Sequence, residues 1–328
     1  MSVIVSRAGF VTTVQDLGRT GSRASGVSLG GALDPHALRV ANLLVGNEPG
    51  AAGLELTMGT VRLQFEDDRV IAWCGGSFDV QIDERAVGGG RAAVVRSGEE
   101  ILVTAKTGRA WLAVSGGLDV PVVLGSRSTD LRSGFGGLEG RALRDGDRLD
   151  VGALSARSNS LLVQLEKTGV SSIFAPNEWS NPARGHPFLR IVSGADSDRF
   201  HESTLETLVV TPFMVTPDSD RMGVRLEGPE LRRSRESDLL SEAVAPGTIQ
   251  VPPSGQPIIL LGDCQTIGGY PKIAHVITVD LGAAAQLQAG DTVRFVEISL
   301  RDAQRLLRER ERDLAMFRTG LELSMRWS

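Results

Sequence analysis

Lysine is scarce in this sequence. Three lysines, Lys106, Lys167 and Lys272, stand among 35 lysine and arginine residues. None of them follows a glycine as a phosphate-binding loop of the Walker A type requires, so the chain does not bind ATP through that motif. Since arginine supplies almost every other positive charge, a lysine marks a position where a compact ammonium group has a use.

Cysteine and histidine are also few, and their spacing matches no metal site. Cys74 and Cys264 fit neither a metal nor a redox motif, so we expect two buried, reduced thiols. The four histidines form no pair with the spacing of a helical zinc site. Residues 75–79 end in the wrong residue for a nucleophile elbow, and residues 134–140 miss the spacing of a dinucleotide-binding loop. The sequence therefore favours part of a larger enzyme or a binding protein.

Aromatic residues and long apolar runs are scarce as well. Aromatics make up 5% of the chain, so the cores must be built from Val, Leu, Ile and Ala. A net charge of -5 and a pI near 5.5 argue against a nucleic-acid surface. No apolar run approaches 18 residues, and residues 1–7 do not form a signal peptide, so we expect a cytoplasmic protein that does not bind membranes.

What the chain does have is glycine and short strands. With 328 residues, 39 Gly and 14 Pro, it is long enough for two domains and favours β structure. Strands are predicted at 54–57, 61–65, 70–73, 78–82, 92–95, 101–104 and 111–115, a spacing typical of a barrel or sandwich. A Gly-Asp turn at 146–147 recurs at 290–291, which suggests two versions of one barrel plan. We expect an N-terminal barrel at 1–154, a connection at 155–185, a second barrel at 186–298 and a helix at 299–328.

Helices have clear signals in two places. Asp34 and Pro35 start a helix that Gly46 ends, with Asn42 on its polar side. Residues 299–318 form an Arg-rich amphipathic helix, whose apolar stripe is predicted at Ala303, Leu306, Leu307, Leu314 and Phe317. The connection at 155–185 includes one predicted strand at 161–165.

The segment 249–272 holds the densest cluster of special residues. A buried strand at 258–261 would place Asp263, Gln265 and Thr266 at its end, followed by a Gly268-Gly269 turn whose backbone can approach a ligand. Two interpretations stay open: a binding site, or a tight hairpin whose Asp and Thr bond their own backbone.

Other residues carry similar alternatives. Lys272 follows this loop and suits a phosphate or carboxylate, although chance placement, taken alone, is the better explanation. Asp220 and Arg221, in the turn of a predicted hairpin, form either a site ion pair or a structural feature of the turn. The arginines, hydroxyls and glycines of residues 125–141 could hold an anion or form a salt-bridged loop.

Taken together, the motifs resemble a known family. They are TVQDLGR at 13–19, GALDP at 31–35, GSRSTD at 125–130, GLEG at 137–140, DRMGVRLEG at 220–228 and the stretch from 246 to 272. The set is similar, in order and over residues 3 to 297, to the KipA-like family, also called allophanate hydrolase subunit 2, the biotin-dependent carboxyltransferase family or the 5-oxoprolinase C subunit. The helix at the C-terminus lies outside the resemblance.

The resemblance implies a mainly β fold with a few helices, in which two β-barrel domains stand in tandem and the second is cyclophilin-like. It implies a KipI-like B subunit (allophanate hydrolase subunit 1) as obligate partner. Members act with a LamB/YcsF-like A subunit as an ATP-dependent 5-oxoprolinase, as the carboxyltransferase region of a biotin-dependent urea carboxylase, or as a regulator that relieves inhibition of a histidine kinase.

Among these, a hydrolase subunit of the 5-oxoprolinase type is the function we predict. The biotin-attachment sequence is missing, because Ala315-Met316 is followed by Phe317, so carboxyl transfer would need a separate biotin carrier. ATP would bind at the subunit interface or elsewhere in the complex, not through a Walker A site on this chain. Ring opening develops negative charge, which suggests Lys272 as charge stabiliser and Asp263 as an acid/base or orienting group. The predicted substrate contacts are Gln250, Gln256, Gln265, Thr266, Gly268, Gly269, Tyr270, Asp220 and Arg221.

Overall fold

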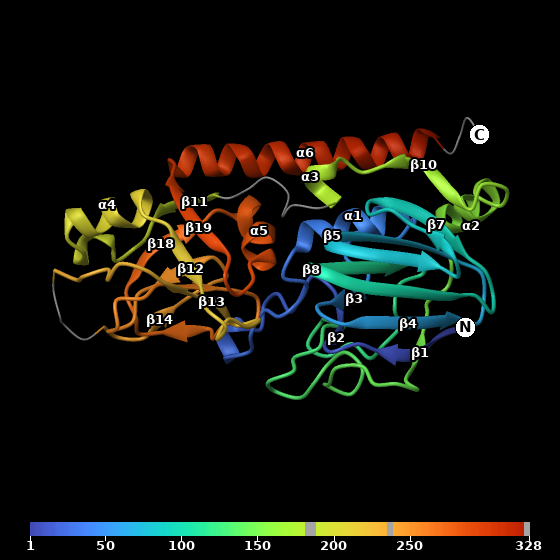
Figure 1. Ribbon diagram of the computed structural model, residues 1–328, viewed down its shortest axis with the longest axis horizontal. Coiled ribbons are helices and arrows are strands. Elements are labelled where there is room, and N and C mark those ends of the chain that lie inside the picture. The colour runs from blue at the N-terminus through green and yellow to red at the C-terminus, as the bar shows by residue number, and fades with distance from the viewer. Residues whose placement is uncertain (181–187, 235–238, 325–328) are drawn as a thin grey trace. The chain divides into compact units, whose positions relative to one another are not determined.

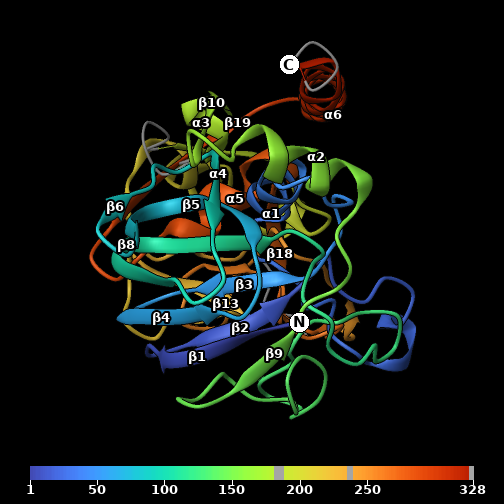
Figure 2. The same cartoon turned by 90° about the vertical axis from the view of Figure 1, so that its right-hand side faces the viewer.

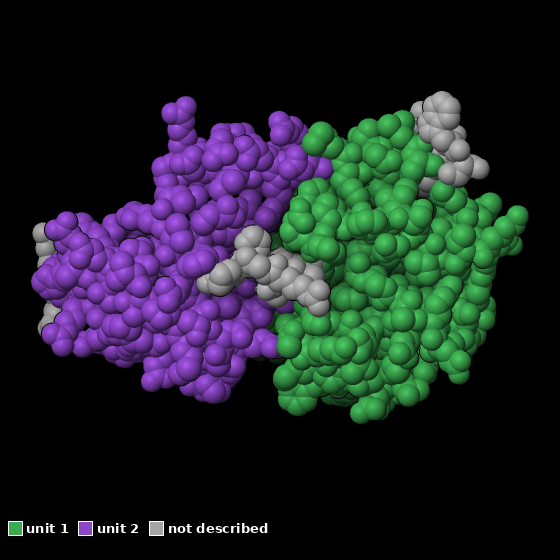
Figure 3. Space-filling model, turned by 45° about the horizontal axis from the view of Figure 1, so that its top comes forward, with its two compact units in different colours: residues 1–19, 30–184, 314–328 green, residues 20–29, 185–313 purple. Residues whose placement is uncertain are grey.

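The chain divides into two compact units. The computed structural model describes residues 1–180, 188–234 and 239–324. Unit 1 comprises residues 1–19, 30–184 and 314–328, and unit 2 comprises residues 20–29 and 185–313 (Figures 1 and 3). The boundary expected at 185/186 lies outside the described residues.

Unit 1 is built on a ten-stranded sheet in which every pairing is antiparallel. Its main strand order is β10-β7-β5-β8-β4-β1-β9, and Figure 2 shows β5, β8, β4 and β1 side by side. The strands are β1 (Ser2–Ala8), β2 (Thr12–Gln15), β3 (Gly53–Leu56), β4 (Thr60–Phe65), β5 (Arg69–Ile82), β6 (Arg85–Ala86), β7 (Arg91–Val95), β8 (Glu100–Val114), β9 (Arg148–Asp150) and β10 (Val170–Phe174). Its core is aliphatic, as the composition predicts, with Val5, Leu54, Leu63 and Val103 fully covered.

The two longest strands correct the sequence prediction, which divided each of them in two. β5 and β8 pair from Ile71 opposite Val114 to Ile82 opposite Ile101, with a bulge near Gly75. A β-carbon on Gly76 would lie 2.3 Å from the carbonyl oxygen of Thr107, so the glycines allow the strands to approach closely. They therefore mark a bulge within one strand, not a turn between two.

Helix α1 (Pro35–Leu44) forms where the sequence predicts it. Asp34 caps it, since its carboxylate accepts a hydrogen bond of 3.0 Å from the backbone N–H of Ala37. Asn42, however, is fully buried instead of solvated. Its Nδ2 donates to the carbonyl oxygen of Ala51 over 2.8 Å, and this bond holds the loop that follows the helix.

The described part of the segment expected as a connection, residues 155–180, belongs to unit 1 and contains a helix where a strand is predicted. α2 (Ala156–Gln164) starts at Ser155, whose hydroxyl accepts from the backbone N–H of Ser158 over 3.0 Å. The apolar residues of 161–165 pointed to a strand, but Leu161 and Leu165 lie one helical turn apart and are buried together. The short helix α3 (Asn177–Ser180) follows β10.

Unit 2 contains a closed barrel. Its seven strands run in the order β11-β18-β15-β16-β13-β12-β19. They are β11 (Phe188–Ser193), β12 (Phe213–Val215), β13 (Gly223–Glu227), β15 (Thr248–Gln250), β16 (Ile258–Leu260), β18 (Lys272–Val276) and β19 (Thr292–Glu297), and β14 (Glu242–Ala243) pairs with β17 (Ile267–Gly268) in a separate ribbon. The mainly β prediction and the barrel of the second half are confirmed.

Helices complete unit 2 and the C-terminal part of the chain. They are η1 (Arg23–Ser25), η2 (Ser197–Arg199), α4 (Glu202–Val210), η3 (Thr278–Asp280), α5 (Leu281–Gln286) and α6 (Leu300–Ser324). Of the predicted stripe on α6, Leu314 is buried, and the ring of Phe317 meets Trp179 edge to face at 5.6 Å. Within the described residues, no helix combines the length and apolar character needed to cross a membrane.

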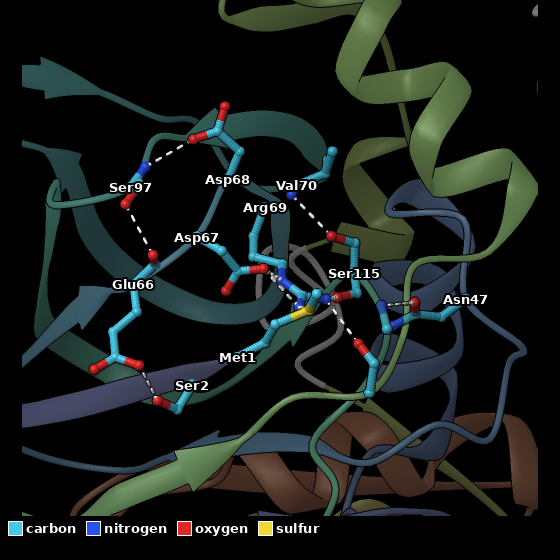
Figure 4. A network of polar contacts seen from close by, with 12 residues as sticks. Met1, Ser2, Asn47, Glu66, Asp67, Asp68, Arg69, Val70, Ser97 and Ser115 are labelled. Carbon is cyan, nitrogen blue, oxygen red and sulfur yellow. Dashed lines mark hydrogen bonds and ion pairs between the residues drawn. The ribbon is translucent and has the colours of Figure 1, made fainter.

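A buried arginine joins three segments of unit 1 at the start of β5. Arg69 is fully covered, and its guanidinium donates to the carbonyl oxygens of Ser115 and Gly152, each over 2.8 Å. Its Nε also bonds Asp67 at 2.8 Å, and Figure 4 shows Met1 beside it. Because a planar guanidinium can serve several acceptors at once, one side chain satisfies three otherwise unpaired groups.

Replacing Arg69 by Met should lower the free energy of unfolding of unit 1 by about 3 kcal/mol, because Asp67 and two carbonyl oxygens lose their buried partner. Urea denaturation followed by tryptophan fluorescence measures the change. Arg96→Met is the matched control: its ion pair with Asp68 at 2.8 Å is exposed, so its loss should cost less than about 1 kcal/mol. Equal losses in the two variants would contradict this account of Arg69.

Candidate functional site

A cavity on the barrel of unit 2 brings together part of the predicted site. We call it the barrel groove; its volume is about 600 Å³. The predicted residues that line it are Asp220, Gln250, Gln256, Gln265 and Tyr270. They come from the loop between β12 and β13, from β15, from the loops on either side of β16, and, for Tyr270, from the turn between β17 and β18. Asp263, Lys272, Arg221, Thr266, Gly268 and Gly269 are not among its lining residues.

Asp263 follows β16, as predicted, but is engaged by an arginine. Its carboxylate accepts from Arg221 through Nε at 2.8 Å and Nη2 at 3.2 Å, and both side chains are nearly buried. The backbone N–H of Asp263 also donates to the carbonyl oxygen of Arg221 over 3.1 Å. A two-point pair of this kind fixes geometry, which favours the orienting role among those predicted for Asp263.

Asp220 and Arg221 do not pair with each other. Oδ1 of Asp220 accepts the backbone N–H groups of Met222 at 2.8 Å and Gly223 at 3.1 Å, so this carboxylate closes the turn before β13. The turn interpretation therefore holds for Asp220. Arg221 points to Asp263 instead, a partner 42 residues away that no local pattern reveals.

Lys272 is held by two carboxylates. Its Nζ lies 2.6 Å from Oε2 of Glu242 and 3.3 Å from Oδ2 of Asp196, and its own side chain is 8% exposed. Burial lowers the pKa of this ammonium group, but the hydrogen bonds to Glu242 and Asp196 outweigh burial and hold the pKa above its ordinary value. Lys272 is thus a firmly charged group at the start of β18.

Two glutamine side chains form a chain of amide hydrogen bonds in the barrel groove. Nε2 of Gln265 donates to Oε1 of Gln250 over 3.3 Å, and Nε2 of Gln250 donates to the carbonyl oxygen of Tyr270 over 3.3 Å. We call this the amide ladder. Gln250 is 1% exposed, so it supports Gln265, which is only half-buried and stands at the end of the ladder.

Gly268 makes room for the amide ladder. A β-carbon at this position would lie 2.7 Å from Nε2 of Gln250. The predicted Gly268-Gly269 turn is corrected here, because Gly268 belongs to β17 and pairs with Glu242 of β14. The backbone N–H of Val244 then donates to the carbonyl oxygen of Thr266 over 3.1 Å, which extends this ribbon.

Gln256 has a structural task at the other side of the groove. Its Oε1 accepts from the backbone N–H of Gly228 at 2.8 Å, and its Nε2 donates to the carbonyl oxygen of Gly228 at 3.1 Å. The amide therefore satisfies both backbone polar groups of one residue, Gly228. This holds the segment before β16 against the end of β13.

Sequence reasoning missed several polar residues of the barrel groove, among them Arg225 and Thr216. The signal for Arg225 was present: in β13 the buried Val224 and Leu226 alternate with the exposed Arg225 and Glu227. Thr216 gave no such signal. Its hydroxyl is buried and finds no hydrogen-bond partner among the described residues.

The glycine-rich loop of unit 1 uses its arginines internally. Arg127 pairs with Asp119 at 2.8 Å, and Arg141 bonds both oxygens of Asp147 at 2.7 and 2.9 Å. For these two residues the salt-bridged alternative fits better than an anion site. Residues 26–30 match the G-x-S-x-G pattern. A nucleophile elbow requires a strand before the serine and a helix directly after it, whereas Ser28 follows the short helix η1 and the next helix starts only at Pro35, so these residues do not form one.

Both cysteines are free and buried, as expected. Burial raises the pKa of the Cys264 thiol, so it is a poor nucleophile although it directly follows Asp263. Within the described residues no group of His, Cys, Asp and Glu could hold a metal ion.

His275 gives the barrel a pH dependence. It lies on β18 with Nδ1 3.2 Å from Oγ1 of Thr248. Burial, and next the charge of Lys272, lower the pKa of this imidazole below the ordinary value of 6.5. The unfolded chain therefore takes up a proton near pH 6.5 that the folded barrel takes up only at lower pH, so stability is full above that pH and is lost as the pH falls below it.

Consequently, the melting temperature of unit 2 should fall when the pH is lowered from 7.5 to 5.5, and His275→Gln should reduce that fall. Thermal unfolding at a series of pH values measures both. His201→Gln is the control. His201 is exposed, and although it stands at the N-cap position of α4, its side chain makes no capping hydrogen bond. If His201→Gln flattens the pH profile as much as His275→Gln does, the assignment to His275 is wrong.

Comparison with known proteins identifies similar chains. A family model described as carboxyltransferase domain, subdomain A and B, matches residues 25–297. The chain is 42% identical to the 5-oxoprolinase C subunit of Escherichia coli (strain K12) over 310 residues, which cover 94% of this chain and 95% of that protein. It is 38% identical to the 5-oxoprolinase C subunit of Haemophilus influenzae over 301 residues, with 91% and 92% covered.

A solved structure shares the fold over almost the whole chain. The crystal structure of urea amidolyase from Kluyveromyces lactis superposes with a TM-score of 0.83 at 29% identity. The match covers 96% of this chain and 20% of the fungal one, so this chain spans about a fifth of that enzyme's length.

Proposed function

The chain belongs to the carboxyltransferase-domain family of subdomains A and B, and we propose that within this family it is the C subunit of an ATP-dependent 5-oxoprolinase complex. The observation that carries the proposal is the end-to-end similarity to two bacterial proteins of that name, since the aligned residues cover 95% and 92% of their lengths. The complex would convert 5-oxoproline, ATP and water into glutamate. Its other members would be a KipI-like B subunit and a LamB/YcsF-like A subunit.

ATP does not fit the barrel groove. Its lining has three carboxylates, Asp218, Asp220 and Glu227, against one arginine, Arg225, whereas a triphosphate requires an excess of cations or backbone N–H groups. ATP supplies the activation of the lactam oxygen, and its binding site is assigned to another part of the complex.

The residues of this chain would bind and orient the lactam. A lactam offers one N–H and one carbonyl oxygen, and the amide ladder presents complementary groups beside the apolar wall of Ile258 and Leu260. Water is thereby kept from part of the ring, which strengthens each remaining hydrogen bond. Asp263 acts through Arg221, whose backbone it holds next to Met222 in the groove.

A charge-stabilising role for Lys272 remains a prediction. Its ammonium group is neutralised by Asp196 and Glu242, so it could stabilise a developing negative charge only after one carboxylate moves away. Glu242 is the candidate, because its side chain is 63% exposed whereas that of Asp196 is 12% exposed. A partner protein that binds over β14 would move the side chain of Glu242 away from Lys272.

A second candidate function is the carboxyltransferase component of a biotin-dependent urea carboxylase. The similarity to the urea amidolyase of Kluyveromyces lactis favours it, at 29% identity. It fits less well, because the identity to the two oxoprolinase proteins is higher and those proteins have nearly the length of this chain. Biotin would have to arrive on a separate carrier protein.

Co-expression of this chain with its KipI-like and LamB/YcsF-like partners should yield a complex that forms glutamate from 5-oxoproline only when ATP is present. Amino-acid chromatography of the products measures this directly. An assembled complex that forms no glutamate would refute the proposal. Adding biotin carboxylase, a biotin carrier and urea to that complex then tests carboxyl transfer.

Gly268→Ala should lower the activity of the complex at least tenfold while the barrel stays folded, because the new methyl group displaces the amide of Gln250. Turnover and circular dichroism of the purified complex measure the two effects. Gly88→Ala is the control, since a β-carbon there meets no atom within 4 Å. Full activity of Gly268→Ala would show that the amide ladder has no part in the reaction.

A further inference from the structure

Strand pairing places Arg225 and Gln250 in one row across the barrel. Arg225 of β13 lies opposite Ile258 of β16, and Ile258 lies opposite Gln250 of β15. Neighbouring strands are spaced by about 4.8 Å, so the Cα atoms of Arg225 and Gln250 are about 10 Å apart. Paired residues point to the same face of a sheet, and all three line the barrel groove.

At the Gln250 end of this row, the side chain of Gln265 is bonded to Gln250 and still has hydrogen-bonding capacity. Gln265 uses one N–H for Gln250, and within the described residues its Oε1 has no hydrogen-bond donor. A free carbonyl and the second N–H of a primary amide can bind the cis amide of a lactam at two points.

The other end of the row is a cation held by its backbone. The N–H of Arg225 donates to Oγ of Ser219 over 3.0 Å, and its carbonyl oxygen accepts from the backbone N–H of Thr216 over 2.9 Å. The guanidinium itself makes no ion pair or hydrogen bond within the described part of the chain and is exposed. The same backbone hydrogen bond places Thr216 beside Arg225, and the buried hydroxyl of Thr216 has no hydrogen-bond partner among the described residues.

We propose that Gln265 and Arg225 together select the substrate: Gln265 binds the lactam amide of 5-oxoproline at two points, and Arg225 binds its carboxylate. The inference rests on the proposed function and names two contacts for it, of which Arg225 is new. The ring of the substrate lies over Ile258, between the two polar ends.

The charges around the groove agree with a small monoanion. Asp220 is committed to the turn before β13, whereas Asp218 and Glu227 are exposed at the rim. One arginine can pair with one carboxylate, but these three acids repel a ligand with several negative charges. The groove therefore selects a lactam that carries a single adjacent carboxylate.

Kinetics of the reconstituted complex test the two contacts separately. Arg225→Met should raise KM for 5-oxoproline at least tenfold and change kcat less than threefold, because the carboxylate contact is the same before and during the reaction. Arg232→Met is the matched control: Arg232 lies on the same unit, is exposed and pairs with Glu230, so KM should stay unchanged. An unchanged KM in Arg225→Met would overturn the inference.

Two fragments of the substrate distinguish binding from general damage. 2-Pyrrolidinone has the lactam but no carboxylate, so its inhibition constant should be the same in wild type and Arg225→Met, and at least fivefold higher in Gln265→Met. Proline has the carboxylate without the lactam and should show the opposite sensitivity. If both variants weaken both fragments equally, the residues support the fold and do not bind the substrate.

Calorimetry with 5-oxoproline separates failure of the site from failure of the proposed function. If the complex binds 5-oxoproline in an Arg225-dependent manner but forms no glutamate, the proposed binding site is supported and the proposed oxoprolinase activity is refuted. If the complex forms glutamate and both Arg225→Met and Gln265→Met bind 5-oxoproline as tightly as wild type, the proposed activity is supported and the proposed site is refuted. Absence of any binding to the assembled wild-type complex refutes the site as well.

Discussion

The antiparallel register of β13, β16 and β15 is the constraint on which the barrel groove depends. Because side chains alternate along a strand, a shift by one residue would turn Arg225 and Gln250 inward and Val224 and Ile249 outward. The fully covered Ile249 and Ile259 oppose that shift through the free energy of burying apolar surface. Closure of the barrel adds a second restraint, since all seven strands would have to slip together.

Several cations of unit 2 serve the framework. Arg221 is paired with Asp263, Lys272 with Asp196 and Glu242, and Arg190 with Asp280. Such pairs join segments distant in sequence and fix their positions, while the cost of removing the charges from water offsets much of their attraction. Arg225 lies outside these pairs and is exposed, so its guanidinium remains accessible to a ligand.

The comparisons and the site contribute different parts of the conclusion. The similarity to two oxoprolinase proteins extends over nearly the whole chain and establishes the family. The same fold also forms about a fifth of a fungal urea amidolyase, so the fold alone does not select a reaction. We propose that this choice depends on the polar groups of the groove, where Gln265 and Arg225 would contact the two polar ends of a small ligand.

Local patterns were reliable where neighbouring residues decide the outcome. The strand at 61–65 and the capped helix from Pro35 were correctly predicted, because alternation and an Asp-Pro start act over a few residues. The predicted strand at 161–165 is a helix, since the cap at Ser155 and burial of Leu161 outweigh its apolar run. In β5, glycines that resemble a turn instead allow close packing against β8.

In the candidate site too, some features follow from the sequence and others only from the tertiary structure. By itself, the sequence determined which segment carries the special residues, since Pro, Gly and Gln cluster at 249–272 and family motifs surround them. Only the tertiary structure decided that Arg221 pairs with Asp263, that Lys272 is neutralised, and that Arg225 shares a row with Gln250. Those contacts join positions tens of residues apart, and their geometry arises from strand register and barrel closure, which no local pattern of side chains specifies.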